Sequence, residues 1–281
     1  MNNATILYVV DIKTSDEAIR HAADCARDAG QYLRCLLHAS PPMLPFNATS
    51  AMAYGGVPIA DHWPQDVARI QDRLRERVRE IEMLFGETGV SGEVTPMFCT
   101  LSDIKQQMVT CTRSADLVVL AENLRKTPEV FVECVHAGLF ASPVGLLINA
   151  MGGEPADHVF LAWDDGDAAS SAVHKGMPLL KASHKITIGC FDPILGESRA
   201  VTDPGADIAA WLTRHGCTVT LAHYPSGGVE IGMCILGKAG ELGADLIFMG
   251  AYGHSRVRQA VFGGTTRTLL EQTGRPVFLG H

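Results

Sequence analysis

The chain contains the same pattern of residues twice, about half its length apart. Residues 114–120 (SADLVVL) have the same order of small, acidic and apolar residues as residues 243–249 (GADLIFM). Further along, Ser142-Pro143-Val144 corresponds to Arg275-Pro276-Val277. Each half also begins with an apolar run that ends in an acidic residue. A repeat of this length indicates two copies of one folding unit.

Within each half, short apolar runs alternate with amphipathic stretches. This pattern is typical of parallel strands that are covered by helices. The predicted fold is therefore α/β, with two similar domains, each a five-stranded mainly parallel sheet with helices on both faces. We expect the domains at residues 1–150 and 156–281, separated by a short Gly- and Pro-containing linker.

The expected elements follow from the same pattern. Strands are expected at residues 5–10, 32–38, 91–98, 117–121 and 144–149, and then at 159–163, 185–190, 218–223, 246–250 and 277–280. Helices are expected to begin near residues 15, 63, 102, 129, 168, 204, 229 and 265.

Composition limits the possible partners and compartment. With 281 residues, 47% of them hydrophobic, the chain can form two sizeable cores. Its net charge of −8 disfavours nucleic acid and anionic membrane surfaces. No apolar run is long enough to span a bilayer and no basic leader is present, so we expect a cytoplasmic protein. The eight cysteines are scattered singly, which predicts free thiols in a reducing compartment.

The most informative segment is glycine-rich and covers residues 250–266 (GAYGHSRVRQAVFGGTT). It follows a predicted strand and leads into a predicted helix. Unpaired main-chain amides and a helix N-terminus both attract an anion, and glycine allows the backbone to approach it closely. Ligands of open parallel sheets bind outside the carboxyl ends of the strands. The sequence therefore predicts a site for the phosphates of a nucleotide.

The spacing of Gly250, Gly253 and Gly263 resembles that of nucleotide-binding members of the universal stress protein family. The resemblance covers the second half and, more weakly, the first, as in tandem members of the family. It implies a Rossmann-like, adenine nucleotide alpha hydrolase-like fold. It also implies a stress-response regulator that binds ATP or a related adenine nucleotide, with or without Mg²⁺.

Two departures from the family pattern affect this expectation. Gly264 stands where the family has a Ser or Thr whose hydroxyl helps to hold phosphate, and Thr265 and Thr266 follow as alternative donors. In the first half, residues 121–126 (AENLRK) take the place of the glycine loop. We therefore expect the nucleotide in the second half only.

The predicted nucleotide-binding residues lie in four segments of the second half. They are Ala162, Asp164, Cys190, Gly250, Gly253, His254, Arg256, Gly263, Gly264, Thr265 and Thr266. By the resemblance, Asp164 and the Cys190 main chain meet the ribose and adenine end. Alternatives remain open: a turn or cap role for Asp164, a core role for Cys190, and solvated loop positions for His254 and Arg256.

No motif specifies a reaction or a metal site. The sequence has no HExxH, Walker or GxSxG motif, so no catalytic residue is predicted and at most slow ATP hydrolysis is expected. The alternative to nucleotide binding is a tandem scaffold that acts through protein interaction or a small apolar ligand. In the family the last strands meet across a dimer axis, so we expect the two domains to form an intramolecular pseudo-dimer. Homodimerisation and a protein partner are left open.

Overall fold

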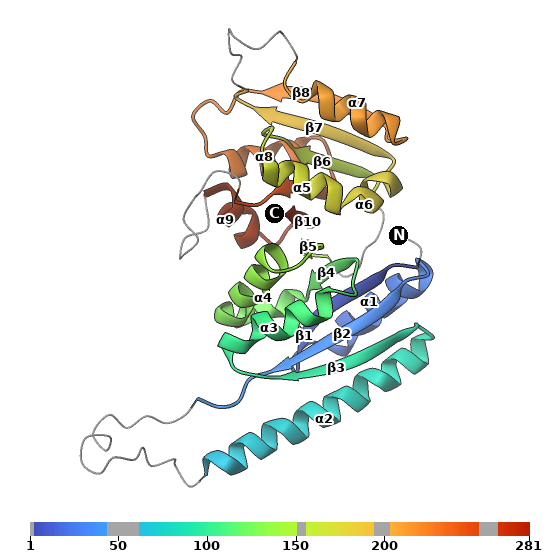
Figure 1. Ribbon diagram of the computed structural model, residues 1–281, viewed down its shortest axis with the longest axis vertical. Helices are drawn as coiled ribbons and strands as arrows, with labels where there is room; N and C mark the ends of the chain where they lie inside the picture. Colours follow the sequence, from blue (N-terminus) through green and yellow to red (C-terminus); the bar gives the residue numbers. More distant parts are fainter. Residues whose placement is uncertain (1–2, 44–61, 151–155, 194–202, 253–263) are drawn as a thin grey trace, which may run out of the picture.

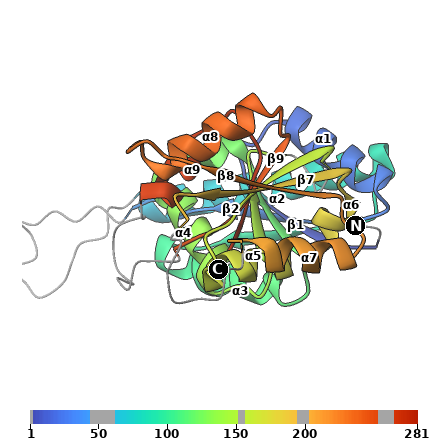
Figure 2. The same cartoon turned by 90° about the horizontal axis from the view of Figure 1, so that it is seen from above.

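Ten strands form one continuous sheet in the computed structural model, which describes residues 3–43, 62–150, 156–193, 203–252 and 264–281. The strand order is β3-β2-β1-β4-β5-β10-β9-β6-β7-β8 (Figure 1). The β5–β10 pair is antiparallel, and the other neighbouring pairs in the described sheet are parallel. Helices lie on both sides of the sheet (Figure 2). The predicted α/β class with a mainly parallel sheet is confirmed.

The first half, which here means residues 3–150, has five strands and their connecting helices in its described ranges, 3–43 and 62–150. They are β1 (Thr5–Asp11), α1 (Asp16–Asp28), β2 (Tyr32–Ala39), α2 (Trp63–Thr88), β3 (Gly92–Phe98), α3 (Leu101–Thr112), β4 (Leu117–Leu120), the 3₁₀ helix η1 (Glu122–Lys126), α4 (Pro128–Phe140) and β5 (Gly145–Ile148).

The second half, residues 156–281, repeats this order. It contains β6 (His158–Ala162), α5 (Asp167–Lys175), α6 (Met177–Ala182), β7 (Lys185–Phe191), α7 (Ala206–Arg214), β8 (Val219–Tyr224), α8 (Ile231–Glu241), β9 (Leu246–Gly250), α9 (Gly264–Glu271) and β10 (Val277–Gly280). The predicted strands and helices are present. The short η1 and α6 were not predicted.

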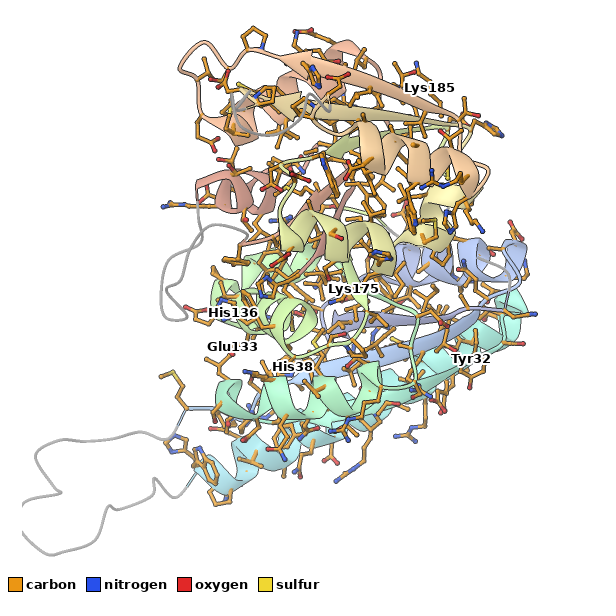
Figure 3. All side chains as sticks on the ribbon, turned by 45° about the horizontal axis from the view of Figure 1, so that its top comes forward. Tyr32, His38, Glu133, His136, Lys175 and Lys185 are labelled. Carbon is orange, nitrogen blue, oxygen red and sulfur yellow. The ribbon has the colours of Figure 1, made fainter. Side chains whose placement is uncertain are left out.

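Burial follows each strand's place in the sheet. Residues Ile6–Val10 of β1, which lies between β2 and β4, are all buried because β1 is covered on both faces. The edge strands β3 and β8 keep many half-exposed residues. Pro96, which has no amide hydrogen, lies in the edge strand β3. Side chains fill the space between the sheet and the helices (Figure 3). No described helix is long and apolar enough to cross a membrane.

The two halves meet where β5 pairs with β10. Phe278 faces Leu147 at the centre of this pair, between Val277–Ile148 and Leu279–Leu146. The Phe278 ring lies where a side chain at Gly145 would be, since a Cβ there would come within 2.0 Å of the ring. A glycine is therefore required at this position for the two halves to approach.

The register of the last strands differs from the match of the two Pro-Val pairs that the sequence repeat predicts. Val118 pairs with Leu146, and the matching residue Ile247 pairs with Val277. Val277 is therefore equivalent to Leu146 in the sheet and not to Val144. The prolines that precede the two last strands occupy different positions, so the proline match in the sequence was wrong in register.

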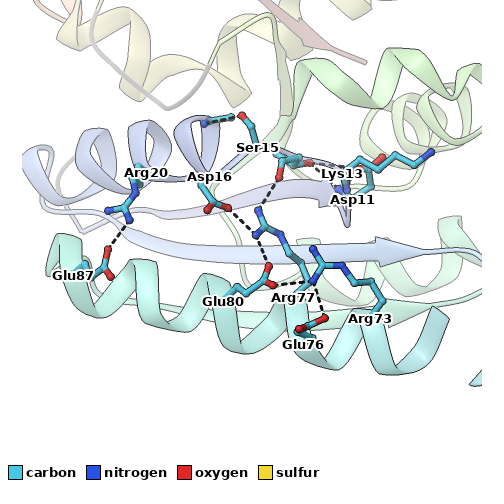
Figure 4. Close-up of polar contacts among 12 residues, drawn as sticks. Asp11, Lys13, Ser15, Asp16, Arg20, Arg73, Glu76, Arg77, Glu80 and Glu87 are labelled. Carbon is cyan, nitrogen blue, oxygen red and sulfur yellow. Dashed lines mark hydrogen bonds and ion pairs between the residues drawn. The ribbon is translucent and has the colours of Figure 1, made fainter. Parts of the chain in front are cut away.

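A buried arginine attaches the long helix α2 to the rest of the first half (Figure 4). Arg77 Nη1 contacts Asp16 at 2.7 Å and Glu80 at 2.6 Å, and Nη2 donates to the Thr14 carbonyl at 2.7 Å. These partners join α2 to the start of α1, where Ser15 caps the helix by accepting from the Ala18 amide. The charge of Arg77 is thus compensated although its side chain is buried.

Candidate nucleotide site

Three strands of the second half end side by side. In the sheet register Ala162 of β6 pairs with Gly189 of β7 and with Met249 of β9. Asp164, Cys190 and Gly250 follow these positions closely and lie at the same carboxyl edge. The topology therefore brings the predicted residues of these three strands together.

Gly250 ends β9 and has a packing role. A Cβ at this position would lie 2.3 Å from the Ala169 nitrogen and 2.4 Å from the Ala168 carbonyl carbon. Both atoms belong to the main chain of α5, so they cannot move away without moving the helix. The first glycine of the segment therefore lets α5 pack directly against β9.

The ends of the glycine-rich segment lie beside each other. The Tyr252 amide, which follows β9, donates to Thr266 Oγ1 in the first turn of α9 at 3.3 Å. Tyr252 has a left-handed φ of 64°. The N-terminus of α9 is thereby placed at the carboxyl edge of the sheet. The predicted residues Gly253, His254, Arg256 and Gly263 lie outside the described part of the chain.

The two threonines expected to replace the missing hydroxyl have partners within the chain. Thr265 Oγ1 donates to Glu230 Oε1 at 3.2 Å, and the buried Thr266 hydroxyl accepts from Tyr252. Gly264 begins α9, and a Cβ there would be 3.6 Å from Glu230 Oε1, an ordinary contact. Attraction of an anion to this point therefore depends mainly on the main-chain amides of the first turn.

Asp164 forms a turn before α5. Its Oδ1 accepts from the Gly166 amide at 3.0 Å, and Gly166 is the N-cap of α5. Asp165 between them has a left-handed φ of 62°. The turn role considered for Asp164 is therefore present. Its side chain is exposed at the same edge as the start of the glycine-rich segment.

Cys190 is a buried thiol at the end of β7. Only 3% of the residue is exposed, and its Sγ contacts the Pro204 carbonyl at 3.6 Å. A Cβ on Gly205 would lie 3.1 Å from the same sulfur. Burial, with a further contribution from the nearby Asp203 carboxylate, raises the pKa of the Cys190 thiol to about 11. The thiol is therefore unreactive at neutral pH, and residues 203–205 cover it.

At the corresponding edge of the first half, the polar side chains are hydrogen-bonded to one another. Asn123 of η1 donates to Asp11 Oδ1 at 2.7 Å and accepts from the Thr14 hydroxyl at 2.9 Å. Asp11 also accepts from the Lys13 amide at 2.8 Å. Asp11 is the register equivalent of Asp164, because Ile6 and Val159 pair with equivalent residues of β4 and β9.

Glu230 is the residue at this edge that sequence analysis missed. It caps α8 by accepting from the Met233 amide at 3.0 Å, and it also accepts from the Thr268 hydroxyl at 3.1 Å. The usual N-cap residues are Ser, Thr, Asp and Asn, so a Glu before an apolar helix gives little indication of a cap. Its contacts with α9 depend on how two helices pack, and no local pattern indicates them.

Within the ranges that the structure describes, no group of three or more His, Cys, Asp or Glu side chains is arranged to hold a metal ion. All eight cysteines, each in a described range, are free thiols.

The fold and this edge define a class: a ten-stranded α/β protein with a helix N-terminus beside the carboxyl ends of parallel strands. No family model and no curated protein matches the chain. Solved structures similar to it include a universal stress family protein from Burkholderia pseudomallei, with 18% identity, TM-score 0.36, and coverage of 52% of this chain and 94% of that one.

A universal stress protein in complex with cAMP is also similar, with 16% identity, TM-score 0.30, and coverage of 52% and 97%. A mutant tryptophan synthase alpha-subunit from Pyrococcus furiosus has 10% identity, TM-score 0.19, and coverage of 85% and 84%. All three TM-scores are below 0.5, so the ligand of the present chain is inferred from its own residues.

Proposed function

We propose that the second half binds an adenine nucleotide, ATP or a related compound with or without Mg²⁺, and that the protein acts as a nucleotide-dependent regulator of the universal stress class. The observation that supports this most directly is the hydrogen bond between the Tyr252 amide and Thr266 Oγ1 at 3.3 Å. It sets the first turn of α9 against the end of β9, where amides and the helix dipole favour a phosphate.

The same proposal assigns different roles to the two halves. Two domains, 1–150 and 156–281, derive from one duplicated unit and associate through β5 and β10 as an intramolecular pseudo-dimer. The first binds no nucleotide, because its Asp11 carboxylate already accepts from Asn123, which in turn accepts from Thr14. The protein acts in the cytoplasm with slow ATP hydrolysis at most, through a protein partner or a homodimer whose affinity the nucleotide changes.

Equilibrium titration with ATP tests nucleotide binding. Gly264→Asp adds a carboxylate at the start of α9, where it would repel phosphate. Its Cβ would lie 3.6 Å from the Glu230 carboxylate, so thermal unfolding must show that the variant is folded. Gly86→Asp adds the same charge on α2 at a position with no atom within 4 Å of the new Cβ. We expect binding by the native chain and by Gly86→Asp, and at least tenfold weaker binding by Gly264→Asp. No binding by the native chain, or equal binding by all three, would refute the proposal.

The engaged threonines support a second candidate, the tandem scaffold that binds no nucleotide and acts through protein interaction or a small apolar ligand. Thr265 already donates to Glu230, and Thr266 already accepts from Tyr252. If natively purified protein releases no adenine absorbance on denaturation and does not bind added ATP, the scaffold function is favoured.

A further inference from the structure

The carboxylate of Glu230 lies between the N-termini of two helices. Oε2 accepts from the Met233 amide at 3.0 Å in the first turn of α8 and from Thr268 Oγ1 of α9 at 3.1 Å. Oε1 accepts from Thr265 Oγ1, also of α9, at 3.2 Å. Both oxygens therefore have hydrogen-bond donors, and α9 contributes one donor to each.

These hydrogen bonds keep the carboxylate charged. Glu230 is exposed, and the limited desolvation of its carboxylate disfavours the ionised form, but the donors from the Gly232 and Met233 amides and from the Thr268 and Thr265 hydroxyls outweigh it and lower the pKa of Glu230. A full negative charge is thus present beside α9 at neutral pH.

This charge is close to the position proposed for phosphate. A Cβ on Gly264, the first residue of α9, would be 3.6 Å from Glu230 Oε1. A phosphate bound to the amides of this turn would therefore lie within several ångströms of a like charge. At such separations near a protein surface, each unit of ligand charge is disfavoured by about tenfold or less in affinity.

We propose that Glu230 is a charge-selectivity residue of the nucleotide site, which disfavours polyphosphates and shifts the preference toward adenine nucleotides with a single phosphate group. This inference rests on the proposed function. Repulsion scales with the charge of the ligand, so ATP is penalised more than AMP. The same carboxylate holds the Thr265 hydroxyl, which could otherwise donate to a phosphate oxygen.

Titration of three proteins with ATP and with AMP in metal-free buffer tests this inference. Glu230→Gln removes the charge and keeps an acceptor for the Met233 amide. Glu241→Gln removes the same charge at the other end of α8, where Glu241 pairs with Lys238. We expect Glu230→Gln to strengthen ATP binding about tenfold and AMP binding about threefold, whereas Glu241→Gln changes both less than twofold.

A second variant guards against misfolding of the first. Glu230→Asp keeps a good helix cap, and its shorter side chain places the carboxylate farther from α9. We therefore expect this variant to bind ATP two- to threefold more tightly than the native chain. Circular dichroism and thermal unfolding check that each variant is folded. If neither folded variant changes the ratio of ATP to AMP affinity, the inference is overturned.

The outcomes separate this inference from the function on which it rests. Native binding with an unchanged ratio in the variants overturns the inference and leaves the proposed function standing. Binding by Glu230→Gln without binding by the native chain supports the inference and refutes nucleotide binding by the native protein. No binding by the native chain or by any folded variant overturns both.

Discussion

Arg125 of the first half donates a hydrogen bond to the main-chain oxygen of Gln272, just beyond the end of α9 in the second half, at 3.3 Å. It also donates to the Leu270 carbonyl and, at 2.6 Å, to Asn149 Oδ1. Asn149 in turn donates to the Gln272 carbonyl at 2.9 Å. The first half thus supplies cationic and amide donors to the C-terminal carbonyls of the helix whose N-terminus borders the candidate site.

Removal of this contact should destabilise the chain. Arg125→Met leaves partly buried carbonyls of α9 without their charged donor, and we expect a loss of about 2 kcal/mol in the free energy of unfolding. Urea denaturation measures it. Lys126→Met removes the same charge from an exposed neighbour in η1 and should change stability by less than about 0.5 kcal/mol. Equal stability of both variants would contradict the role assigned to Arg125.

Gly250 should be required for packing whether or not a nucleotide binds. Gly250→Ala forces a Cβ against the main chain of Ala168 and Ala169, and we expect about 3 kcal/mol of destabilisation. Gly237→Ala in α8 meets no atom within 4 Å and should stabilise the helix by up to about 1 kcal/mol. Thermal and urea unfolding of both variants check this. A fully stable Gly250→Ala would show that α5 and β9 do not pack this closely.

Restoring a hydroxyl at position 264 should strengthen nucleotide binding. A Cβ fits there, because its nearest neighbour outside the adjacent chain would be Glu230 Oε1 at 3.6 Å, an ordinary contact. We expect Gly264→Ser to bind ATP about three- to tenfold more tightly than the native chain, since it adds one donor for phosphate. Gly264→Ala adds the Cβ without the hydroxyl. If Ser and Ala give the same affinity, the hydroxyl has no part in binding.

Stability should fall as the pH is lowered below neutrality. His158 is 8% exposed, with Nδ1 3.2 Å from the Leu242 carbonyl and Nε2 2.8 Å from Thr187 Oγ1. Burial, together with the nearby charge of Lys185, lowers the pKa of His158 in the folded chain. The unfolded chain therefore binds the proton more readily, and stability present above about pH 6.5 is lost as the pH decreases.

Urea denaturation at several values between pH 8 and pH 5 measures this slope. His158→Gln should flatten it. The control is His184→Gln, because the His184 side chain is 85% exposed. If His158→Gln leaves the slope of unfolding free energy against pH unchanged, other groups cause the pH dependence. His38 is then the first candidate, because burial also lowers its pKa.

Sequence periodicity predicted the strands and most helices because burial on both faces leaves continuous apolar runs, as in residues 6–10 and 246–249. It missed η1 and α6, which are too short to show a period. The pairing of β5 with β10 followed from a family resemblance and not from the residues themselves.

The candidate site was only partly accessible from sequence. Gly250 was singled out for a phosphate, yet a Cβ at this position would meet main-chain atoms of α5. Thr265 was expected to face a ligand, and it donates instead to Glu230, 35 residues away along the chain. Such contacts depend on how α8 packs against α9. The sequence around Glu230 and Thr265 contains no local pattern that predicts this packing.

Hydrogen exchange of the main-chain amides of residues 264–268, measured with and without ATP, tests the central claim most directly. The amides at the start of α9 are the donors proposed to hold the phosphates, so ATP should slow their exchange while the amides of η1 in the first half exchange at the same rate as before. If saturating ATP leaves residues 264–268 unchanged, or protects the first half instead, the proposed site is wrong.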